Sequence, residues 1–334
     1  MYDAAFLERL ADGLRRALPR WDLPADARLD LLTVSENATF RAAGPGGADL
    51  VFRVHRPGYH SRAEIASELA WIAALRAEEI VPTPRPVPLR DGSLIADIDD
   101  AGIPRQVVAF EFVAGREPDE RDDLVAWFEV LGAIHARLHQ HARTWARPAG
   151  FARKVWNFDT MLGRTPLWGD WRAALGLDAA GAAVLARAVA ALAHDLRAAG
   201  TGPDAFGLIH ADLRLANLLV AGDRLALIDF DDCGFSWFLY DFAAAVSFIE
   251  HTPIVPDLCA AWVAGYRTRL PLSDAAAAQL PMFVMLRRIL LTAWIASHAE
   301  TPTAQGLGTG YTAGTVEMAE AYLARRPQPV EAGG

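Results

Sequence analysis

The spacing of apolar residues divides the chain into a β-rich first third and a largely helical remainder. Near the start, leucines recur at helical intervals and predict a first helix through Leu7, Leu10, Leu14 and Leu18. Short apolar runs follow and predict strands at residues 28–34, 39–43 and 50–55. The glycines and proline of residues 44–47 predict a tight turn between the last two strands.

A second helix is predicted to begin at Ser61, because Ser61 and Glu64 have the spacing of a capping box. Its apolar stripe consists of Ile65, Leu69, Ile72 and Leu75. Alternate prolines between residues 82 and 88 then favour an extended segment. A turn at residues 100–102 and a strand at residues 106–113 complete the β-rich part.

From residue 124 onward the apolar spacing is helical, interrupted by one hairpin at residues 218–230 with a turn at Gly222-Asp223. The most apolar run, residues 282–296, contains Arg287 and Arg288, which a membrane span would hold only at high cost, so we expect a buried core helix. The pattern predicts an α+β fold with a small β-rich lobe at residues 1–113 and a larger helical lobe at residues 114–334.

Composition narrows the class of protein. Hydrophobic residues make up 52% of the 334 residues and charged residues 22%, which is typical of a globular chain. The net charge of −9 provides no general attraction for nucleic acid or an anionic membrane, so we expect small-molecule or cationic partners. Asp3, Glu8 and Arg9 interrupt any secretory signal, and the two cysteines match no metal or redox spacing, so we expect a cytoplasmic protein. The sequence specifies no oligomeric state.

The strongest chemical signal is the segment His210-Ala211-Asp212-Leu213-Arg214-Leu215-Ala216-Asn217, followed by an apolar strand that ends at Asp229. Phosphoryl transfer to a hydroxyl requires a carboxylate near the acceptor, a role that suits Asp212. It also requires oxygen ligands for Mg²⁺, which Asn217 and Asp229 supply. Arg214 lies between these positions in the sequence and can reach a transferring phosphate.

This arrangement resembles the catalytic core of the protein-kinase-like superfamily, above all its aminoglycoside phosphotransferase and choline kinase branch. The resemblance implies a two-lobed kinase fold and an ATP-dependent phosphotransferase. It implies that Asp212 is the base, that Asn217 and Asp229 bind Mg²⁺, and that His210 is structural. Asp241, after Tyr240, corresponds to an aspartate that braces the catalytic loop.

The resemblance extends into the β-rich lobe. Ser35-Glu36-Asn37 falls where the family has its nucleotide-covering hairpin, and the nucleotide base is expected near Glu111 to Val113. Arg53 stands where the third strand normally carries a lysine, because the only lysine, Lys154, comes too late in the chain. Glu68 is the expected ion-pair partner of Arg53. The patterns Glu36-Asn37, His55-Arg56-Pro57 and Asp229-x-Asp231-Asp232 are similar to bacterial stress-response kinases and homoserine-kinase-like members.

The acceptor is less specified. The acidic residues Asp231, Asp232, Glu250 and Asp257 favour a cationic or zwitterionic substrate, such as an amino alcohol, amino acid or amino sugar. Candidates for an aromatic face against an ammonium group are Trp156, Trp168 and Trp237, which equally fit a core. Arg287 and Arg288 could instead bind a carboxylate.

Several alternatives stay open. The chain could be a Ser/Thr protein kinase or a non-catalytic nucleotide-binding module, and the donor could be ATP or GTP. Asp229-Phe230-Asp231 also looks like the nucleophile motif of haloacid-dehalogenase-like phosphatases. His135 and His139 have the spacing of zinc ligands on a helix, although packing explains them better. Arg53 and Glu68 could be a surface pair, and Asp241 could be a helix cap.

Overall fold

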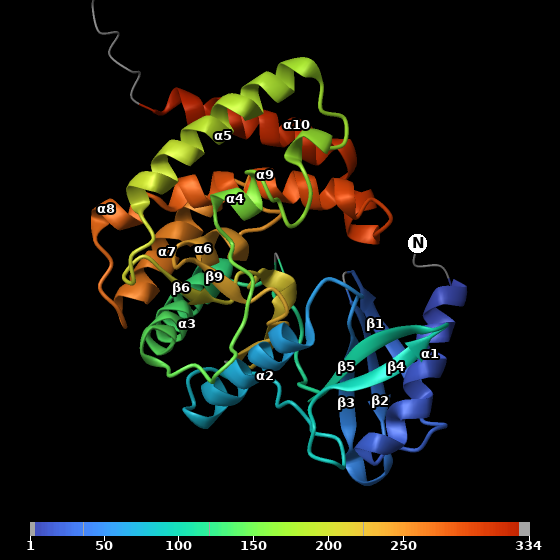
Figure 1. Cartoon of the computed structure of the whole chain (residues 1–334). Helices are drawn as coiled ribbons and strands as arrows, with labels where there is room; N and C mark the ends of the chain where they lie inside the picture. Colours follow the sequence, from blue (N-terminus) through green and yellow to red (C-terminus); the bar gives the residue numbers. More distant parts are fainter. Residues whose placement is uncertain (1–3, 36, 120, 223, 327–334) are drawn as a thin grey trace, which may run out of the picture.

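The computed structural model describes residues 4–35, 37–119, 121–222 and 224–326. The first part of the chain forms an antiparallel sheet of five strands in the order β1-β2-β3-β5-β4 (Figure 1). Its strands are β1 (Leu29–Val34), β2 (Ala38–Ala43), β3 (Asp49–Val54), β4 (Ala96–Asp100) and β5 (Ile103–Glu111). The three strands predicted first, and the hairpins between them, are confirmed.

Side chains of the sheet alternate between a buried face and a more exposed face. In β2 the residues Ala38, Phe40 and Ala42 are buried, and β3 contributes Leu50, Phe52 and Val54 to the same cluster. The helix α1 (Ala4–Ala17) covers this cluster with Leu10 and Leu14, as its leucine spacing predicts. A 3₁₀ turn at Leu18–Trp21 continues the cover.

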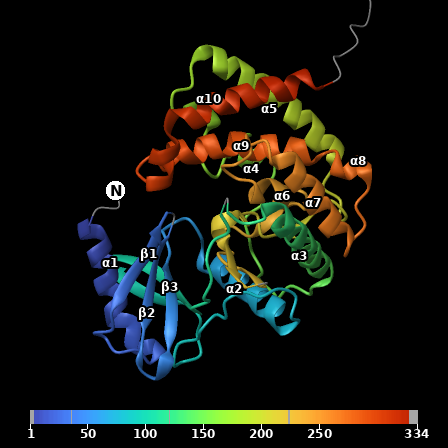
Figure 2. The same ribbon diagram turned by 180° about the vertical axis from the view of Figure 1, so that it is seen from behind.

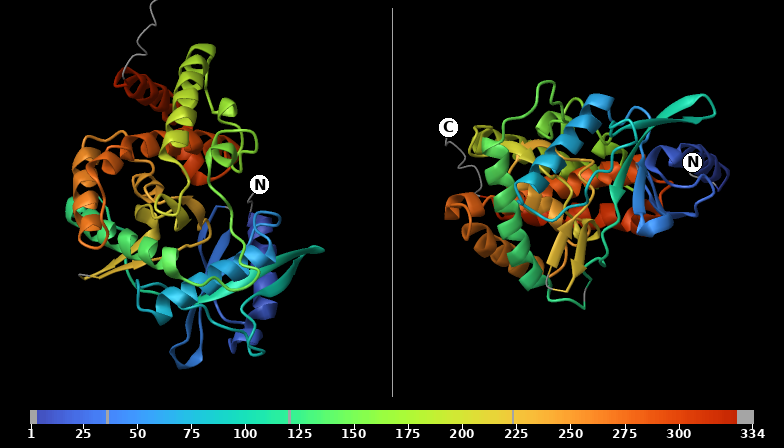
Figure 3. Two further views of the ribbon diagram at one scale, coloured as in Figure 1. Left: turned by 60° about the vertical axis from the view of Figure 1, so that its left-hand side comes forward. Right: turned by 90° about the horizontal axis from the view of Figure 1, so that it is seen from below.

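The helix α2 (Arg62–Ala77) lies between the sheet and the rest of the chain (Figure 3). Ser61 caps it as predicted: its hydroxyl accepts from the Glu64 backbone, and the Glu64 side chain accepts from the Ser61 backbone. Ile65 and Leu69 pack with strand residues of the sheet lobe. Trp71, Ile72 and Leu75 belong to the core of the helical lobe instead, so one helix contributes to both lobes.

The helical lobe holds most of the remaining elements. Its helices are α3 (Leu124–Thr144), α4 (Phe158–Met161), α5 (Ala179–Ala199), α6 (Tyr240–Ala245), α7 (Val255–Arg267), α8 (Asp274–Ala277), α9 (Leu280–Ser297) and α10 (Pro302–Ala324). Two small antiparallel sheets pair β6 (Phe206–Ile209) with β9 (Gly234–Trp237) and β7 (Leu218–Ala221) with β8 (Arg224–Leu227). The helices α5 and α10 lie side by side at the end farthest from the five-stranded sheet (Figure 2).

The helix α9 runs through the centre of the helical lobe. Two segments of the described chain are long and apolar enough to cross a membrane: α5 and a segment that includes α9. In the segment that includes α9, 83% of the most apolar 18-residue stretch is buried inside the protein. Arg287 and Arg288 are each 2% exposed. The expected buried core helix is therefore confirmed. The predicted lobe boundary at residue 113 falls between β5 and α3 and stays a prediction.

Candidate active site

A cleft of about 410 Å³ opens between the two lobes. The sheet lobe contributes residues of β1, β2, β3 and β5, and the helical lobe contributes the loop after β6, the residues after β8, and α9. Most of the residues predicted from the sequence line this cleft, namely Ser35, Asn37, Arg53, Glu68, Glu111, Val113, Asp212, Arg214, Asn217, Asp229, Asp231 and Asp232.

The loop after β6 is held in shape by buried polar groups. The Asp241 carboxylate accepts a hydrogen bond from the Ala211 backbone at 2.8 Å, and Ala211 has a φ of +68°. The same carboxylate contacts His139 Nε2 at 2.9 Å. Burial acts to raise the pKa of Asp241, but the neighbouring histidines outweigh it and hold that pKa at about 2. His210 is fully buried and contacts the Ile228 carbonyl, so both residues support the loop as the resemblance implies.

Asp212 presents its carboxylate to the cleft with a partner on each oxygen. Asn217 Nδ2 donates to Oδ2 at 2.9 Å, and Arg287 Nη2 donates to Oδ1 at 2.5 Å. Arg214 Nε lies 3.6 Å from Oδ2. The sequence does not predict this contact of Arg287: it suggests a residue of a core helix or a ligand for a substrate carboxylate, whereas Arg287 pairs with Asp212.

Asn217 and Asp229 lie next to each other at the same end of the cleft. The backbone carbonyl of Asn217 accepts a hydrogen bond from the backbone N–H of Ile228 at 3.0 Å. Because Asp229 follows Ile228 directly, this bond keeps its backbone close to Asn217. Asp229 has a φ of +61°, and its side chain is 47% exposed to the cleft. Desolvation raises the pKa of Asp229 to about 6, although the positive charge of Arg53 acts to lower it. Repulsion from the neighbouring carboxylates of Asp231, Asp212 and Glu68 raises this pKa further.

Arg53 connects the sheet lobe to this end of the cleft. Its Nη2 donates to Glu68 at 2.5 Å, and its Nη1 donates to Asp229 at 3.0 Å. Glu68 is fully buried and Arg53 is 5% exposed, so the alternative of a surface pair is wrong. The predicted ion pair is confirmed, and it lies within reach of the predicted metal ligand.

Asn37 and Asp231 have side chains that hold the lobes together. Asn37 Nδ2 donates to Asp231 at 2.7 Å, and Asn37 Oδ1 accepts from the Arg56 backbone. His60 Nε2 lies 3.4 Å from the same carboxylate. Asp231 is 5% exposed, which favours a bridging role over contact with an acceptor. Glu36 and Asp223, which the sequence patterns included, lie outside the described residues.

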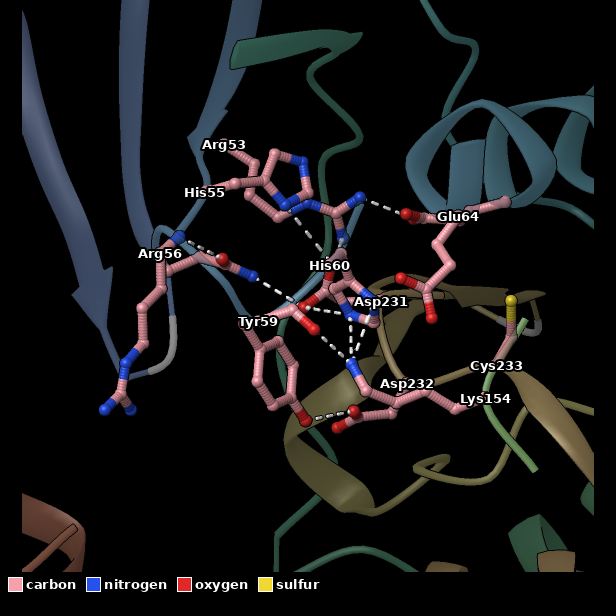
Figure 4. A network of polar contacts seen from close by, with 12 residues as sticks. Arg53, His55, Arg56, Tyr59, His60, Glu64, Lys154, Asp231, Asp232 and Cys233 are labelled. Atoms are coloured by element: carbon pink, nitrogen blue, oxygen red, sulfur yellow. Dashed lines mark hydrogen bonds and ion pairs between the residues drawn. The ribbon is translucent and has the colours of Figure 1, made fainter. Parts of the chain in front are cut away.

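Figure 4 shows Tyr59, His60 and Lys154 gathered around Asp231 and Asp232. Tyr59 donates its hydroxyl hydrogen to Asp232 at 2.6 Å and accepts from Trp168 Nε1 at 2.9 Å. Lys154 Nζ donates to the Tyr59 carbonyl at 2.6 Å, and burial lowers its pKa. Asp232 therefore lines the cleft within a network of side chains from both lobes.

Some predicted acceptor residues lie elsewhere. Trp237 is 3% exposed in β9, donates to the Gly200 carbonyl and packs on Phe206, so its predicted place in the acceptor site is wrong. Trp156 is also buried, while Trp168 lines the cleft. Glu250 is buried and paired with Arg288 at 2.8 Å, so neither is turned to an acceptor, and Asp257 does not line the cleft.

The histidine pair of α3 has a structural explanation. His139 lies between Asp241 and the Tyr266 hydroxyl, and His135 accepts from Trp262 Nε1 at 2.8 Å. Both side chains are fully buried. Packing and hydrogen bonding therefore account for their spacing, as the sequence favoured.

Comparison with known proteins agrees with this geometry. A family model described as the phosphotransferase enzyme family matches residues 32–277, most of the chain. This chain belongs to that family. An uncharacterized protein of Deinococcus radiodurans is 31% identical over 288 residues, which span 84% of this chain and 80% of that protein.

Solved structures extend the comparison. A microcompartment-associated aminopropanol kinase superposes with a TM-score of 0.86 at 48% identity, over 93% of this chain and 97% of that one. An amicoumacin kinase bound to AMP-PNP, Ca²⁺ and Ami superposes with a TM-score of 0.77 at 22% identity, over 98% and 95% of the chains, and shows the shared fold. The phosphotransferase described here is a kinase with the protein-kinase-like fold that acts on a hydroxyl group of a small molecule. The phosphatase alternative is excluded.

Proposed function

We propose that this phosphotransferase transfers the γ-phosphate of Mg²⁺-bound ATP to the hydroxyl group of a small amino alcohol. The observation that carries the proposal is the convergence of Asp212, Asn217 and Asp229 on one end of the cleft, opposite the Arg53–Glu68 pair. The likeness to an aminopropanol kinase along nearly the whole of both chains supports an amino alcohol as the acceptor class.

The nucleotide would lie along the sheet-lobe side of the cleft. Its base would contact the backbone near Glu111 and Val113, and Ser35 would cover the phosphates from the β1–β2 turn. Arg53 would contact the phosphates, because its guanidinium is fixed by Glu68 and directed at Asp229. Asn37 would act on the nucleotide indirectly, by fixing Asp231 and the chain at Arg56.

The residues at the phosphate end fit a magnesium ion. Asn217 uses its amide hydrogens on Asp212, which leaves its side-chain oxygen for a metal, and Asp229 supplies a charged oxygen. Desolvation, together with the nearby carboxylates, raises the pKa of Asp229, and a divalent cation beside it would favour its charged form. Asn217 and Asp229 would hold Mg²⁺, which supplies charge neutralisation for the triphosphate.

Asp212 would act as the base. The acceptor hydroxyl oxygen forms a bond to the γ-phosphorus, the bond between that phosphorus and the ADP oxygen breaks, and the hydroxyl proton passes to Asp212. Arg287 and Asn217 hold the carboxylate in one orientation, so the acceptor meets a prepared base. Arg214, beside Asp212, would stabilise charge on the transferring phosphate.

The acceptor end has the chemistry that an ammonium group requires. The Trp168 ring and the Asp232 carboxylate both line the cleft there, joined through Tyr59. An aromatic face and a carboxylate together attract a cation more strongly in a partly dry cleft than in water. We therefore assign the substrate amine to Asp232 and Trp168. The free cysteines Cys233 and Cys259 and the need for ATP support a cytoplasmic location.

The test is phosphate transfer from ATP and Mg²⁺ to 1-amino-2-propanol, followed by phosphorus NMR of the product. Asp212→Ala is expected to lower kcat by about 10²–10⁴-fold with little change in ATP affinity, because the base acts only in the chemical step. Arg28→Ala, at a side chain 85% exposed and outside the cleft, is the matched control and should retain full activity. Full phosphate transfer by Asp212→Ala would refute the assignment of the base.

A further inference from the structure

Phe248 separates the catalytic cleft from a second hollow in the helical lobe. It follows α6 and has a φ of +71°, in the left-handed region that a bulky side chain rarely adopts. Among the described residues it is the one residue that lines both hollows. Its ring centroid lies 6.3 Å from that of Trp294, which lines the cleft, and 6.0 Å from that of Tyr311, which lines the second hollow.

The second hollow is large and mostly apolar. It has a volume of about 1460 Å³ and lies among α5, α7, α9 and α10. Its apolar lining includes Val255, Met282, Val284, Met285, Leu307 and Met318. Of the charged residues in its wall, Arg288 pairs with Glu250 at 2.8 Å and Arg326 pairs with Asp195. These walls suit an alkyl chain better than a charged ligand.

The strained backbone of Phe248 is fixed from both sides by α9. Arg287 Nε donates to the Ser247 hydroxyl at 3.0 Å, and Arg288 Nη1 donates to Glu250 at 2.8 Å. The two arginines therefore hold the residues flanking Phe248 in the chain. Strain of this kind persists only where the surroundings determine the conformation, and it concentrates at functional sites.

Phe248 also borders the place where the acceptor would react. The guanidinium carbon of Arg214 lies 5.9 Å from the centre of the Phe248 ring, and Arg214 Nε lies 3.6 Å from the Asp212 carboxylate. An acceptor with its hydroxyl at Asp212 would thus have the Phe248 ring between itself and the second hollow.

We infer that Phe248 determines acceptor size: it closes the acceptor end of the cleft against the apolar hollow and restricts the enzyme to short amino alcohols. The inference rests on the proposed function, because it concerns the acceptor of that reaction. Without the ring, the hydroxyl would still meet Asp212 while an alkyl tail extends into the second hollow. The bonds made and broken are the same as for the short acceptor.

The experiment compares 1-amino-2-propanol with 1-amino-2-octanol as acceptors for the wild-type enzyme, Phe248→Ala and Phe248→Gly. The ratio of kcat/KM for the long acceptor to that for the short one is expected to rise at least tenfold in both variants, because methylene groups in an apolar pocket discriminate by about tenfold or more. Glycine adopts a φ of +71° without strain, so Phe248→Gly should fold even if Phe248→Ala does not. Thermal melting shows whether each variant is folded.

Met318→Ala is the matched control, because Met318 lines the second hollow but not the cleft. It enlarges the hollow without opening it to the cleft and should leave the ratio at the wild-type value. The inference is overturned if both Phe248 variants fold and bind ATP with the ratio unchanged, or if the wild-type enzyme uses the two acceptors equally well.

Calorimetric titration with 1-amino-2-octanol in the presence of AMP-PNP separates this inference from the proposed function. If the wild-type enzyme phosphorylates neither compound but the Phe248 variants gain affinity for the long one, the proposed function fails and the role of Phe248 as a barrier stands. If the folded variants gain no affinity, the barrier itself is refuted.

Discussion

At the scale of single residues, the guanidinium group of Arg53 contacts two carboxylates through two different nitrogen atoms, which the single nitrogen of a lysine could not do. Its two terminal nitrogens bind Glu68 at 2.5 Å and Asp229 at 3.0 Å. A lysine has a single nitrogen on a flexible stem, so it would lose the planar fork that joins α2 to the phosphate end of the cleft. We therefore expect that a lysine could not replace this arginine without loss of one of the two contacts.

We expect Arg53→Lys to raise the KM for ATP about tenfold or more, because a hydrogen bond to a charged group contributes about 1.5–3 kcal/mol. Steady-state kinetics with varied ATP measure the effect. Arg105→Lys is the control, since Arg105 pairs with Asp100 in the same sheet but outside the cleft, and its KM for ATP should match the wild type. An unchanged KM in Arg53→Lys would show that the fork is dispensable.

Local spacing in the sequence predicted one group of cleft residues, and the family resemblance predicted others, such as Arg53 and Glu68. Asp212, Asn217 and Asp229 follow from the order loop, strand, turn and strand, because a short chain path keeps them together. Arg287 could not be found in this way, since it is 75 residues from Asp212 in the chain and lies within an apolar run. Trp237 was misplaced because burial in a core and exposure in a cleft give the same aromatic signal in a sequence.

At the scale of elements, α3 and α7 cross at two glycines. A Cβ atom on Gly132 would overlap the carbonyl oxygen of Trp262, and one on Gly265 would overlap that of Glu129. The backbones therefore approach closely, which presses Phe128 and Trp262 into one core. Apolar periodicity predicted that helices exist here, but the partner and closeness of each helix depend on this three-dimensional contact.

We expect Gly132→Ala to lower the free energy of unfolding by about 1–3 kcal/mol, because the added methyl group forces the helices apart. Urea denaturation measures the change. Gly310→Ala in α10 is the control: a Cβ there meets no atom within 4 Å, so the change should stabilise the helix by up to about 1 kcal/mol. Equal stability of the two variants would contradict the close crossing.

At the scale of the whole molecule, the two lobes are joined by polar side chains around Asp231 and Asp232 and at His298. Asn37 binds Asp231, Tyr59 binds Asp232, and Arg56 Nη1 lies 3.2 Å from His298 Nε2. These contacts come from the sheet lobe on one side and the helical lobe on the other. They fix the turn between β1 and β2 relative to the residues that follow β8.

We expect Asn37→Ala to raise the KM for ATP and to lower the free energy of unfolding by about 1–3 kcal/mol, because Asp231 loses a buried donor. Kinetics and urea denaturation measure the two effects. In a double-mutant cycle with Asp231→Ala, the two changes should be non-additive, since each removes the hydrogen bond between Asn37 and Asp231. Additive effects would mean that Asn37 and Asp231 act independently.

The helix α2 carries a consequence for how this enzyme is controlled. In protein kinases, activity depends on whether the helix glutamate reaches its strand partner, and regulation moves that helix. Here Trp71 and Leu75 are fully buried in the helical lobe while Ile65 and Leu69 are buried against the sheet. Swinging α2 outward would expose large apolar surfaces on both sides at once. We therefore expect Glu68 to stay paired with Arg53, and the activity of the enzyme to follow the supply of its substrates without a movement of α2.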